Sequence, residues 1–383
     1  MGVNDDIADR LITNAVALSR FDAELRAKVL GYLAELEAEL LRLTTNSSVA
    51  DGARVTTRQR RAEALFKETQ ALIVSDYRAI KNMVSGDLAA LAGLQGEAIM
   101  SAVNGAVKAD IFTVSMTPGE LKTLAKDTLI QGSPAEEWWG QQAGNTKARF
   151  QREVRMGLMS GETNDQIVRR VRGTATGERK RIRMPNGKSR LVRVFRSGVM
   201  PTSTREAESL VRTAVQTVGN RVDEAMFRAN QDVLRGIQAL VTLDGKTTLT
   251  CISRSGAGWY FDGRPFEESP RQEQYPGPAP WHFGCRTKMS PVTKSWDDMI
   301  QEAGGKVKTN IKKVGPKKRA SMDGLVAGDV SFDGWLKTKS KGFQIDKLGK
   351  ERWELWNEGK LPLSKLTDFT GRPLTVDQLK KNL

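Results

Sequence analysis

Two long stretches of helical periodicity at the start of the chain constrain its fold most strongly. Within 5–45, apolar side chains recur at helical spacing with one gap, at Asn14, which is the pattern of an amphipathic helix. These side chains are Ile7, Leu11, Leu18, Leu25, Val29, Leu33, Leu36, Leu40 and Leu43. After a polar break at 44–57, a second helical region continues to about residue 108. We therefore expect an elongated, bundle-like helical N-terminal half rather than a compact α/β enzyme.

Further helices are expected in the middle of the chain. Residues 136–173 indicate two helices, in which Trp138 and Trp139 are interpreted as core or interface anchors. Ser203 and Glu206 have the spacing of a capping box and predict a helix start. That helix carries an apolar stripe with steps of three and four, which predicts a core-facing surface. The stripe consists of Val211, Val215, Val218, Val222 and Met226.

A basic β-hairpin is predicted between these helices, at 173–200. Asn186-Gly187 separates two strand-like runs, and this dipeptide is a strong hairpin signal. Successive side chains of a strand point to opposite faces, so Arg181 and Arg183 share one face and Ile182 lies on the other. One face of the first arm is therefore expected to be strongly basic. The arms carry Arg179, Lys180, Arg181, Arg183, Lys188, Arg190, Arg193 and Arg196. The hairpin is interpreted either as a solvated surface or as a contact for DNA or an acidic protein.

The C-terminal part of the sequence is mixed in character. Strands are expected in "IQALVTLDG" and "GWYFDGRPF", followed by a proline-rich loop that leads to His282. The basic stretch 301–330 is expected to be a linker. Its candidate contact residues are Lys312, Lys313, Lys317, Lys318 and Arg319. Residues 331–383 are expected to form a helical tail, with apolar anchors at Trp335, Leu336, Phe343, Leu348, Trp353 and Trp356.

Charge and composition narrow the function classes. The formal net charge of +15 favours an anionic partner such as a nucleic acid or an acidic protein surface. A single histidine excludes HNH nucleases and two-histidine zinc hydrolases by counting. The two cysteines are too few for a disulfide scaffold, which is typical of a protein made in the cytosol. The sequence contains neither a long apolar membrane span nor a secretory signal pattern.

An ordered series of motifs resembles a known family. The helix containing "LVRTA" is followed by "TLDG", then by Cys251, a proline-rich loop and the stretch "HFGCRTKMSPV". This order resembles the phage minor head proteins, also called head morphogenesis proteins, typified by the F protein of phage Mu and the minor head protein of phage SPP1. The tail also looks like the C-terminal end of such proteins, so the resemblance covers roughly residues 135–383.

The resemblance implies a structural, non-enzymatic virion protein of a tailed bacteriophage. Such a protein binds the portal vertex and packaged double-stranded DNA in several copies, and acts in procapsid assembly or in genome packaging and ejection. Its implied partners are the portal protein, the major capsid or scaffold protein and DNA, with no membrane contact while assembled. It would lie in the head interior or at the portal vertex, after synthesis in the host cytoplasm. The expected organisation is a helical region at 1–130, a Mu F-like core at 131–300 with the hairpin inserted at 173–200, a basic linker at 301–330 and a helical tail at 331–383.

The cysteine–histidine cluster allows four interpretations. Cys251, His282 and Cys285 are candidate ligands of a structural zinc ion, because His-x-x-Cys spacing lets both side chains reach one metal. Some relatives carry cysteines where this chain has Thr248 and Thr287, which weakens the zinc interpretation, although Asp244 or Asp262 could supply a fourth ligand. The alternatives are a Cys251–Cys285 disulfide, a reduced structural cluster without a cofactor, and a catalytic Cys285–His282 pair.

Two rival functions remain on the sequence alone. One is a non-specific DNA-binding virion protein that is not tied to the portal. The other is an effector enzyme carried by the phage, but no unassigned stretch after residue 300 is large enough for a toxin domain, and no carboxylate cluster suggests a nuclease.

Overall fold

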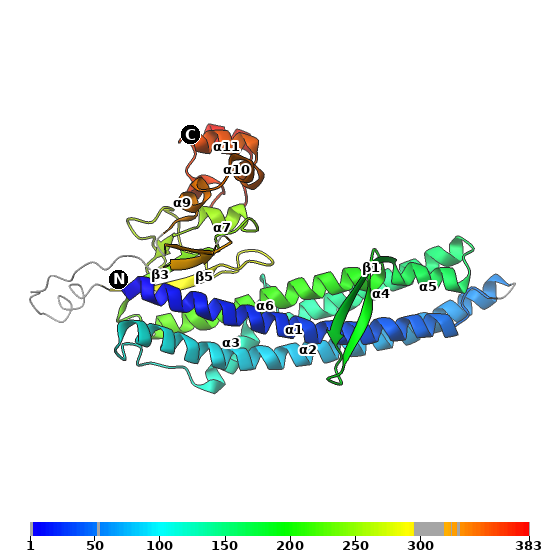
Figure 1. The fold of residues 1–383 in the computed structure, drawn as a ribbon. Helices are drawn as coiled ribbons and strands as arrows, with labels where there is room; N and C mark the ends of the chain where they lie inside the picture. Colours follow the sequence, from blue (N-terminus) through cyan, green and yellow to red (C-terminus); the bar gives the residue numbers. More distant parts are fainter. Residues whose placement is uncertain (1–2, 52–53, 295–317, 323, 328–329, 383) are drawn as a thin grey trace, which may run out of the picture. The chain divides into compact units, whose positions relative to one another are not determined.

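The computed structural model confirms a mainly helical fold with a smaller α+β module (Figure 1). It describes the chain except for residues 1–2, 52–53, 295–317, 323, 328–329 and 383. The chain divides into two compact units. Unit 1 comprises Met1–Leu18, Ala89–Gln131 and Gln216–Leu383, and unit 2 comprises Ser19–Leu88 and Gly132–Val215.

The two long N-terminal helices that the periodicity predicts are confirmed. Helix α1 spans Val3–Asn46 and helix α2 spans Val55–Val107, so they contain 44 and 53 residues. At 1.5 Å per residue these are rods of about 66 and 80 Å. All nine apolar positions predicted for the first stripe are buried, from Ile7 to Leu43. No helix in the described part of the chain is both long and apolar enough to span a bilayer.

Unit 2 combines parts of α1, α2 and α6 with two shorter helices and a hairpin. The added elements are α4 (Ala135–Met159), α5 (Asn164–Arg172), β1 (Thr174–Arg183) and β2 (Ser189–Arg196), and α6 runs from Val199 to Ala229. A buried chain of hydroxyl groups joins three of the helices. Tyr77 Oη lies 2.8 Å from Thr146 Oγ1, which in turn lies 2.7 Å from Ser203 Oγ.

The predicted capping box at the start of α6 is wrong. The helix begins at Val199, so Ser203 lies one turn inside it and donates a hydrogen bond to the carbonyl of Val199. Glu206 forms an ion pair with Arg149 of α4 instead of reaching back along its own helix. Pro201 is accommodated in the first turn, where a backbone N–H has no helical partner. The capping box does not form, because Ser203 and Glu206 bond instead to Thr146 and Arg149 of α4.

Unit 1 contains a three-stranded antiparallel sheet in the order β4-β3-β5. The strands are β3 (Leu234–Leu240), β4 (Gly258–Trp259) and β5 (Lys288–Thr293). The two strands predicted at 237–245 and 258–266 are confirmed only at 237–240 and 258–259, and the rest of both stretches is not strand. The same unit holds α3 (Pro118–Asp127) and the short helix α7 (Leu249–Ser253). The stripe on α6 is confirmed as core, since its five side chains are at most 2% exposed.

The C-terminal segment is helical, as predicted. Its elements are α9 (Phe332–Lys337), α10 (Lys341–Leu348), α11 (Lys350–Asn357), the 3₁₀ turn η1 (Leu363–Lys365) and α12 (Val376–Lys381). Trp335, Leu336, Leu348 and Trp356 are buried in one apolar cluster with Cys251 and Cys285, and Phe343 and Trp353 pack against it. The predicted tail is thus part of the core of unit 1. Within 301–330, the stretch expected to be a linker, strands β6 (Lys318–Ser321) and β7 (Gly324–Ala327) form a hairpin.

Gly31 of α1 provides a test of how the β1–β2 hairpin packs against that helix within unit 2. A Cβ atom at this position would lie 2.3 Å from the carbonyl oxygen of Arg183, whereas one at Gly86 of α2 would meet no atom within 4 Å. Glycine-to-alanine changes inside helices normally stabilise by about 0.5–1 kcal/mol, and we expect this for Gly86→Ala. For Gly31→Ala we expect a loss of about 1–3 kcal/mol, because the backbone of the hairpin must move. Urea unfolding of both variants measures the difference, and equal stabilisation would contradict this packing.

Candidate functional site

The structure confirms the predicted hairpin and fixes its register. Arg179 pairs with Arg193, Arg181 with Leu191 and Arg183 with Ser189. Because directly paired residues share a face, these positions form one side of the ribbon. The other side carries Ile182, which is only 7% exposed. In Figure 1 the hairpin crosses α1, and its contact with Gly31 places the arm carrying Arg183 against that helix.

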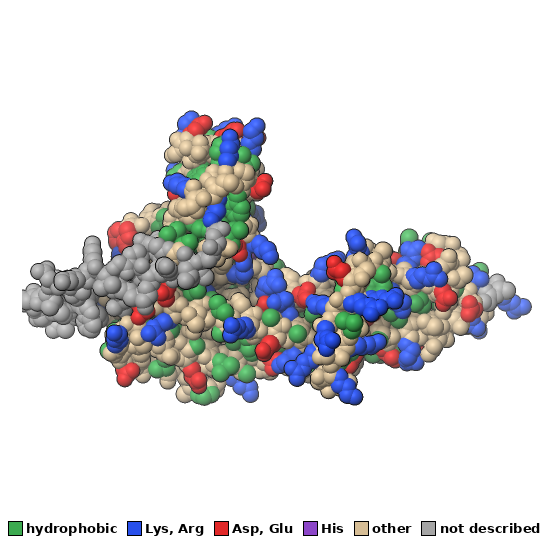
Figure 2. Space-filling view, viewed as in Figure 1, with side chains coloured by type: hydrophobic (Ala, Val, Ile, Leu, Met, Phe, Trp, Pro, Cys, Tyr) green, Lys and Arg blue, Asp and Glu red, His purple; other side chains and the backbone are tan. Residues whose placement is uncertain are grey.

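The outer side of the hairpin is an exposed basic face, formed by Arg179, Arg181, Arg183 and Arg193. All four residues are exposed, as are Lys180, Lys188, Arg190 and Arg196. Figure 2 shows Lys and Arg side chains gathered along this ribbon. Within the described residues, Lys180 is the only one of the eight with a carboxylate oxygen within 4.0 Å, that of Glu208.

The register of the basic face is electrostatically unfavourable without a partner. Arg179 and Arg193 lie directly opposite each other, and like charges in this arrangement destabilise a strand pair. An anion between the guanidinium groups removes this repulsion and forms charge-assisted hydrogen bonds. The arrangement is therefore suited to a phosphate backbone or an acidic protein surface.

The second basic stretch is only partly described. Lys312, Lys313 and Lys317 lie outside the described residues. Lys318 and Arg319 lie in β6, where their backbones pair with Ala327 and Val326 of β7. The structure therefore assigns both residues to a strand.

The other candidate site brings together the cysteines and the histidine that the sequence singled out. Cys251 Sγ lies 3.5 Å from Cys285 Sγ and 3.1 Å from His282 Nε2. One ligand atom from each of the three residues lies within 4.8 Å of the others, so the group can hold a metal ion. Both cysteines are free and buried, and His282 is partly buried.

The local structure explains how these three side chains meet. Thr248 caps helix α7 and accepts a hydrogen bond from the backbone N–H of Cys251 at 3.4 Å. Asn220 of α6 is fully buried, and its Nδ2 donates to the carbonyls of Ala279 at 2.7 Å and Thr287 at 3.0 Å. Because these carbonyls flank the loop with His282 and Cys285, a single helix side chain holds both ends of that loop.

Hydrogen bonds within the group shift the pKa values of all three side chains. A hydrogen bond between the two sulfur atoms, together with burial, raises the pKa of Cys251. The same hydrogen bond, joined by one from His282, lowers the pKa of Cys285 well below the ordinary thiol value in spite of burial. The pKa of His282 is raised, mainly by its hydrogen bond to Cys285. Of the two thiols, Cys285 is therefore the one that loses its proton more readily, and the thiolate is the form that binds metals.

Among the described residues, no fourth histidine, cysteine or carboxylate joins the three side chains. Asp244 does not join the group, because its carboxylate accepts hydrogen bonds from the guanidinium of Arg286 at 2.5 and 2.8 Å. Asp262 is held by Arg264. Thr248 Oγ1 is closer to the cluster, 2.9 Å from His282 Nε2. The hydroxyl group of Thr248 is thus within hydrogen-bond distance of one ligand atom of the cluster.

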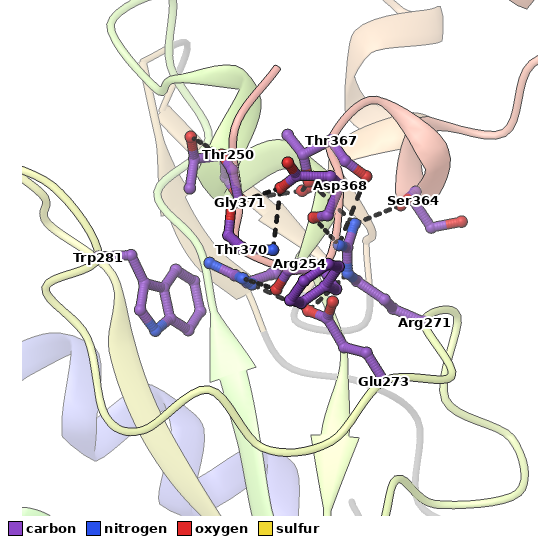
Figure 3. Close-up of polar contacts among 12 residues, drawn as sticks. Thr250, Arg254, Arg271, Glu273, Trp281, Ser364, Thr367, Asp368, Thr370 and Gly371 are labelled. Atoms are coloured by element: carbon purple, nitrogen blue, oxygen red, sulfur yellow. Dashed lines mark hydrogen bonds and ion pairs between the residues drawn. The ribbon is translucent and has the colours of Figure 1, made fainter. Parts of the chain in front are cut away.

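A buried arginine network, which the sequence reasoning missed, also lies in unit 1 (Figure 3). The Glu273 carboxylate lies 3.1 Å from Arg254 Nε and 2.6 Å from Arg271 Nε. The Arg254 guanidinium also lies 4.8 Å from the ring centre of Trp281. In the sequence these residues look like ordinary loop charges, and no spacing signal separates them from the exposed arginines.

Comparison with known proteins gave no family assignment. No protein-family model matches the chain, and neither the curated proteins nor the solved structures include a significant match.

Proposed function

We propose that this chain is a structural minor head protein of a tailed bacteriophage, which binds the portal vertex and packaged DNA. The observation that carries the proposal is the basic face of the hairpin, an exposed row of arginines without carboxylate partners among the described residues. The order of motifs from the helix with "LVRTA" to "HFGCRTKMSPV" adds the link to head morphogenesis.

The proposed role is structural and assembly-related. Several copies would lie at one vertex, in the head interior or at the portal, and contact the portal protein, the major capsid or scaffold protein and double-stranded DNA. The protein would act in procapsid assembly or in genome packaging and ejection, after synthesis in the host cytoplasm. Exposed guanidinium groups suit this role because they contact phosphates irrespective of base sequence.

The first test is binding of the purified protein to its cognate portal protein at about 0.1 M and about 0.5 M salt. We expect binding at both salt concentrations, because a specific interface retains its apolar contacts when exposed charges are screened. Surface plasmon resonance with immobilised portal protein measures this. Absence of portal binding, combined with DNA binding at low salt, would favour the alternative of a DNA-binding virion protein that is not tied to the portal.

The hairpin is tested with a variant in which the four arginines of the basic face are replaced by serine. We expect this variant to bind double-stranded DNA more weakly. The slope of log Kd against log salt concentration should also become shallower, by about 0.9 for each DNA phosphate that the variant no longer neutralises. Fluorescence anisotropy over a salt series gives both quantities.

The matched control for this variant removes the same charge from exposed helix positions of unit 2. It replaces Arg20, Arg60, Arg78 and Arg205 by serine. If the control loses as much DNA affinity as the hairpin variant, the effect is one of net charge and the hairpin is not the contact surface.

We also propose that Cys251, His282 and Cys285 hold a structural zinc ion. A tetrahedral site with Zn–S bonds of 2.3 Å places two thiolates about 3.8 Å apart, close to the 3.5 Å between the two sulfur atoms here. Water or the Thr248 hydroxyl would complete the coordination. Such an ion would join helix α7 to the loop that precedes β5, and thereby stabilise unit 1.

The zinc proposal predicts about one equivalent of zinc in protein purified under reducing conditions. Cys285→Ser should lose the ion, whereas Thr248→Cys should bind it more tightly because it supplies a third thiolate. Elemental analysis measures the content, and thermal unfolding with and without a chelator measures the stabilisation. Metal-free wild-type protein whose melting temperature is insensitive to both zinc and chelator would contradict the proposal.

A further inference from the structure

The turn Asp368–Arg372 displays an aromatic side chain on the surface of unit 1. Phe369 is 80% exposed, although phenylalanine is usually buried in folded proteins. The flanking segments pair across the turn, with the N–H of Asp368 donating to the carbonyl of Arg372 at 2.9 Å and that of Leu374 to Leu366 at 3.0 Å. Phe369 therefore lies at the tip of a small, closed hairpin-like loop.

Hydrogen bonds within the loop satisfy its own polar groups. Asp368 Oδ1 accepts hydrogen bonds from the backbone N–H groups of Thr370 and Arg372, both at 2.9 Å, and from the Thr370 hydroxyl at 2.7 Å. Gly371 has a φ of +88°, which other residues rarely adopt, and donates its N–H to the carbonyl of Asp368 at 3.0 Å. Aspartate at the start of a turn and glycine with positive φ at its end fit a type I turn followed by a bulge.

The buried arginine network holds this loop from below (Figure 3). Arg271 donates to the carbonyls of Ser364 at 2.6 Å and Asp368 at 2.5 Å. Arg254 donates to the carbonyl of Phe369 at 3.3 Å. A Cβ atom on Gly371 would lie 2.8 Å from Arg254 Nη1, so the loop fits tightly against the network.

The network that holds this surface loop consists of buried charged groups, and burying charge is energetically unfavourable. Its two arginines and one glutamate carry more positive than negative charge. Arg254 is only 1% exposed and Arg271 only 7% exposed. Buried charges must be offset by well-placed polar groups, and here the carbonyls of the loop supply them. The result is a preorganised aromatic tip, and preorganisation lowers the entropy lost when a partner binds.

The surroundings of Phe369 indicate the chemistry of the partner. Two exposed cationic residues lie next to the tip, since Lys365 lines the same cavity as Phe369 and Arg372 ends the turn, while the carboxylate of Asp368 is engaged by hydrogen bonds within the turn. A cavity of about 430 Å³ beside it is lined by Leu361, Leu374 and Leu379 together with the Phe369 ring. A second copy of this chain would present the same positive charges and repel. A protein surface with an apolar pocket and an acidic rim is complementary.

We infer that Phe369 is the anchor residue through which this chain contacts the portal protein. The inference rests on the proposed function, which supplies the portal as the partner, and it assigns the contact to one loop of unit 1. Aromatic anchors that enter a pocket at the centre of an interface carry much of the binding energy.

The test compares Phe369→Ser with Leu94→Ser in binding to the cognate portal protein. Leu94 is also exposed, at 61%, and lies in unit 1, so it is a matched apolar control. We expect about 30-fold weaker binding for Phe369→Ser, the effect of a hot-spot residue, and an unchanged affinity for Leu94→Ser. Equal melting temperatures of the variants establish that the fold is intact, since neither side chain is buried.

A charge-reversal variant tests the acidic rim independently. Lys365→Glu combined with Arg372→Glu should weaken portal binding, most clearly at low salt. If wild type and Phe369→Ser bind the portal equally, the inference is overturned while the proposed function stands. If the wild-type protein does not bind the portal protein at all, both the inference and the proposed portal-binding function are contradicted.

Discussion

A fully buried ion pair in unit 1 holds the elements on which the cysteine–histidine group depends. Asp223 of α6 is 0% exposed and Lys288 of β5 is 3% exposed, and their charged atoms lie 2.8 Å apart. Gln95 of α2 donates to the other carboxylate oxygen at 2.6 Å. Removing one partner of such a pair leaves an uncompensated buried charge, which costs about 3–5 kcal/mol. The start of β5, and with it the loop carrying Cys285, is therefore fixed against α6 one helical turn from Asn220.

Arginine serves two opposite purposes in this chain. On the hairpin, the guanidinium groups of the basic face are exposed and find no carboxylate partner among the described residues, and Arg179 lies opposite Arg193, so these groups are available to an external anion. In unit 1, Arg254 and Arg271 are buried, and they donate to backbone carbonyls and to Glu273. The large positive charge of the chain is thus a mixture of binding groups and structural groups, and composition cannot separate the two.

The features that the sequence predicted correctly are those set by short-range periodicity. The leucine stripe predicted α1, and the valine stripe predicted the buried side of α6. Asn186-Gly187 predicted the hairpin, and strand alternation placed Ile182 on the face opposite Arg181 and Arg183. The capping box at Ser203 failed although its spacing was correct. Ser203 bonds to Thr146 of α4, 57 positions away, and local spacing holds no information about such a partner.

By itself, the sequence determined the helical class, the basic hairpin and the identity of the three candidate metal ligands. Only the tertiary structure decided that Cys251 and Cys285 meet within 3.5 Å, that Asp244 is engaged by Arg286, and that the tail packs into the core of unit 1. It also decided that Phe369 is displayed while Trp335 is buried, although both are aromatic residues of the same tail. The reason is physical: helix and strand patterns repeat over a few residues, whereas burial depends on which distant segments pack together.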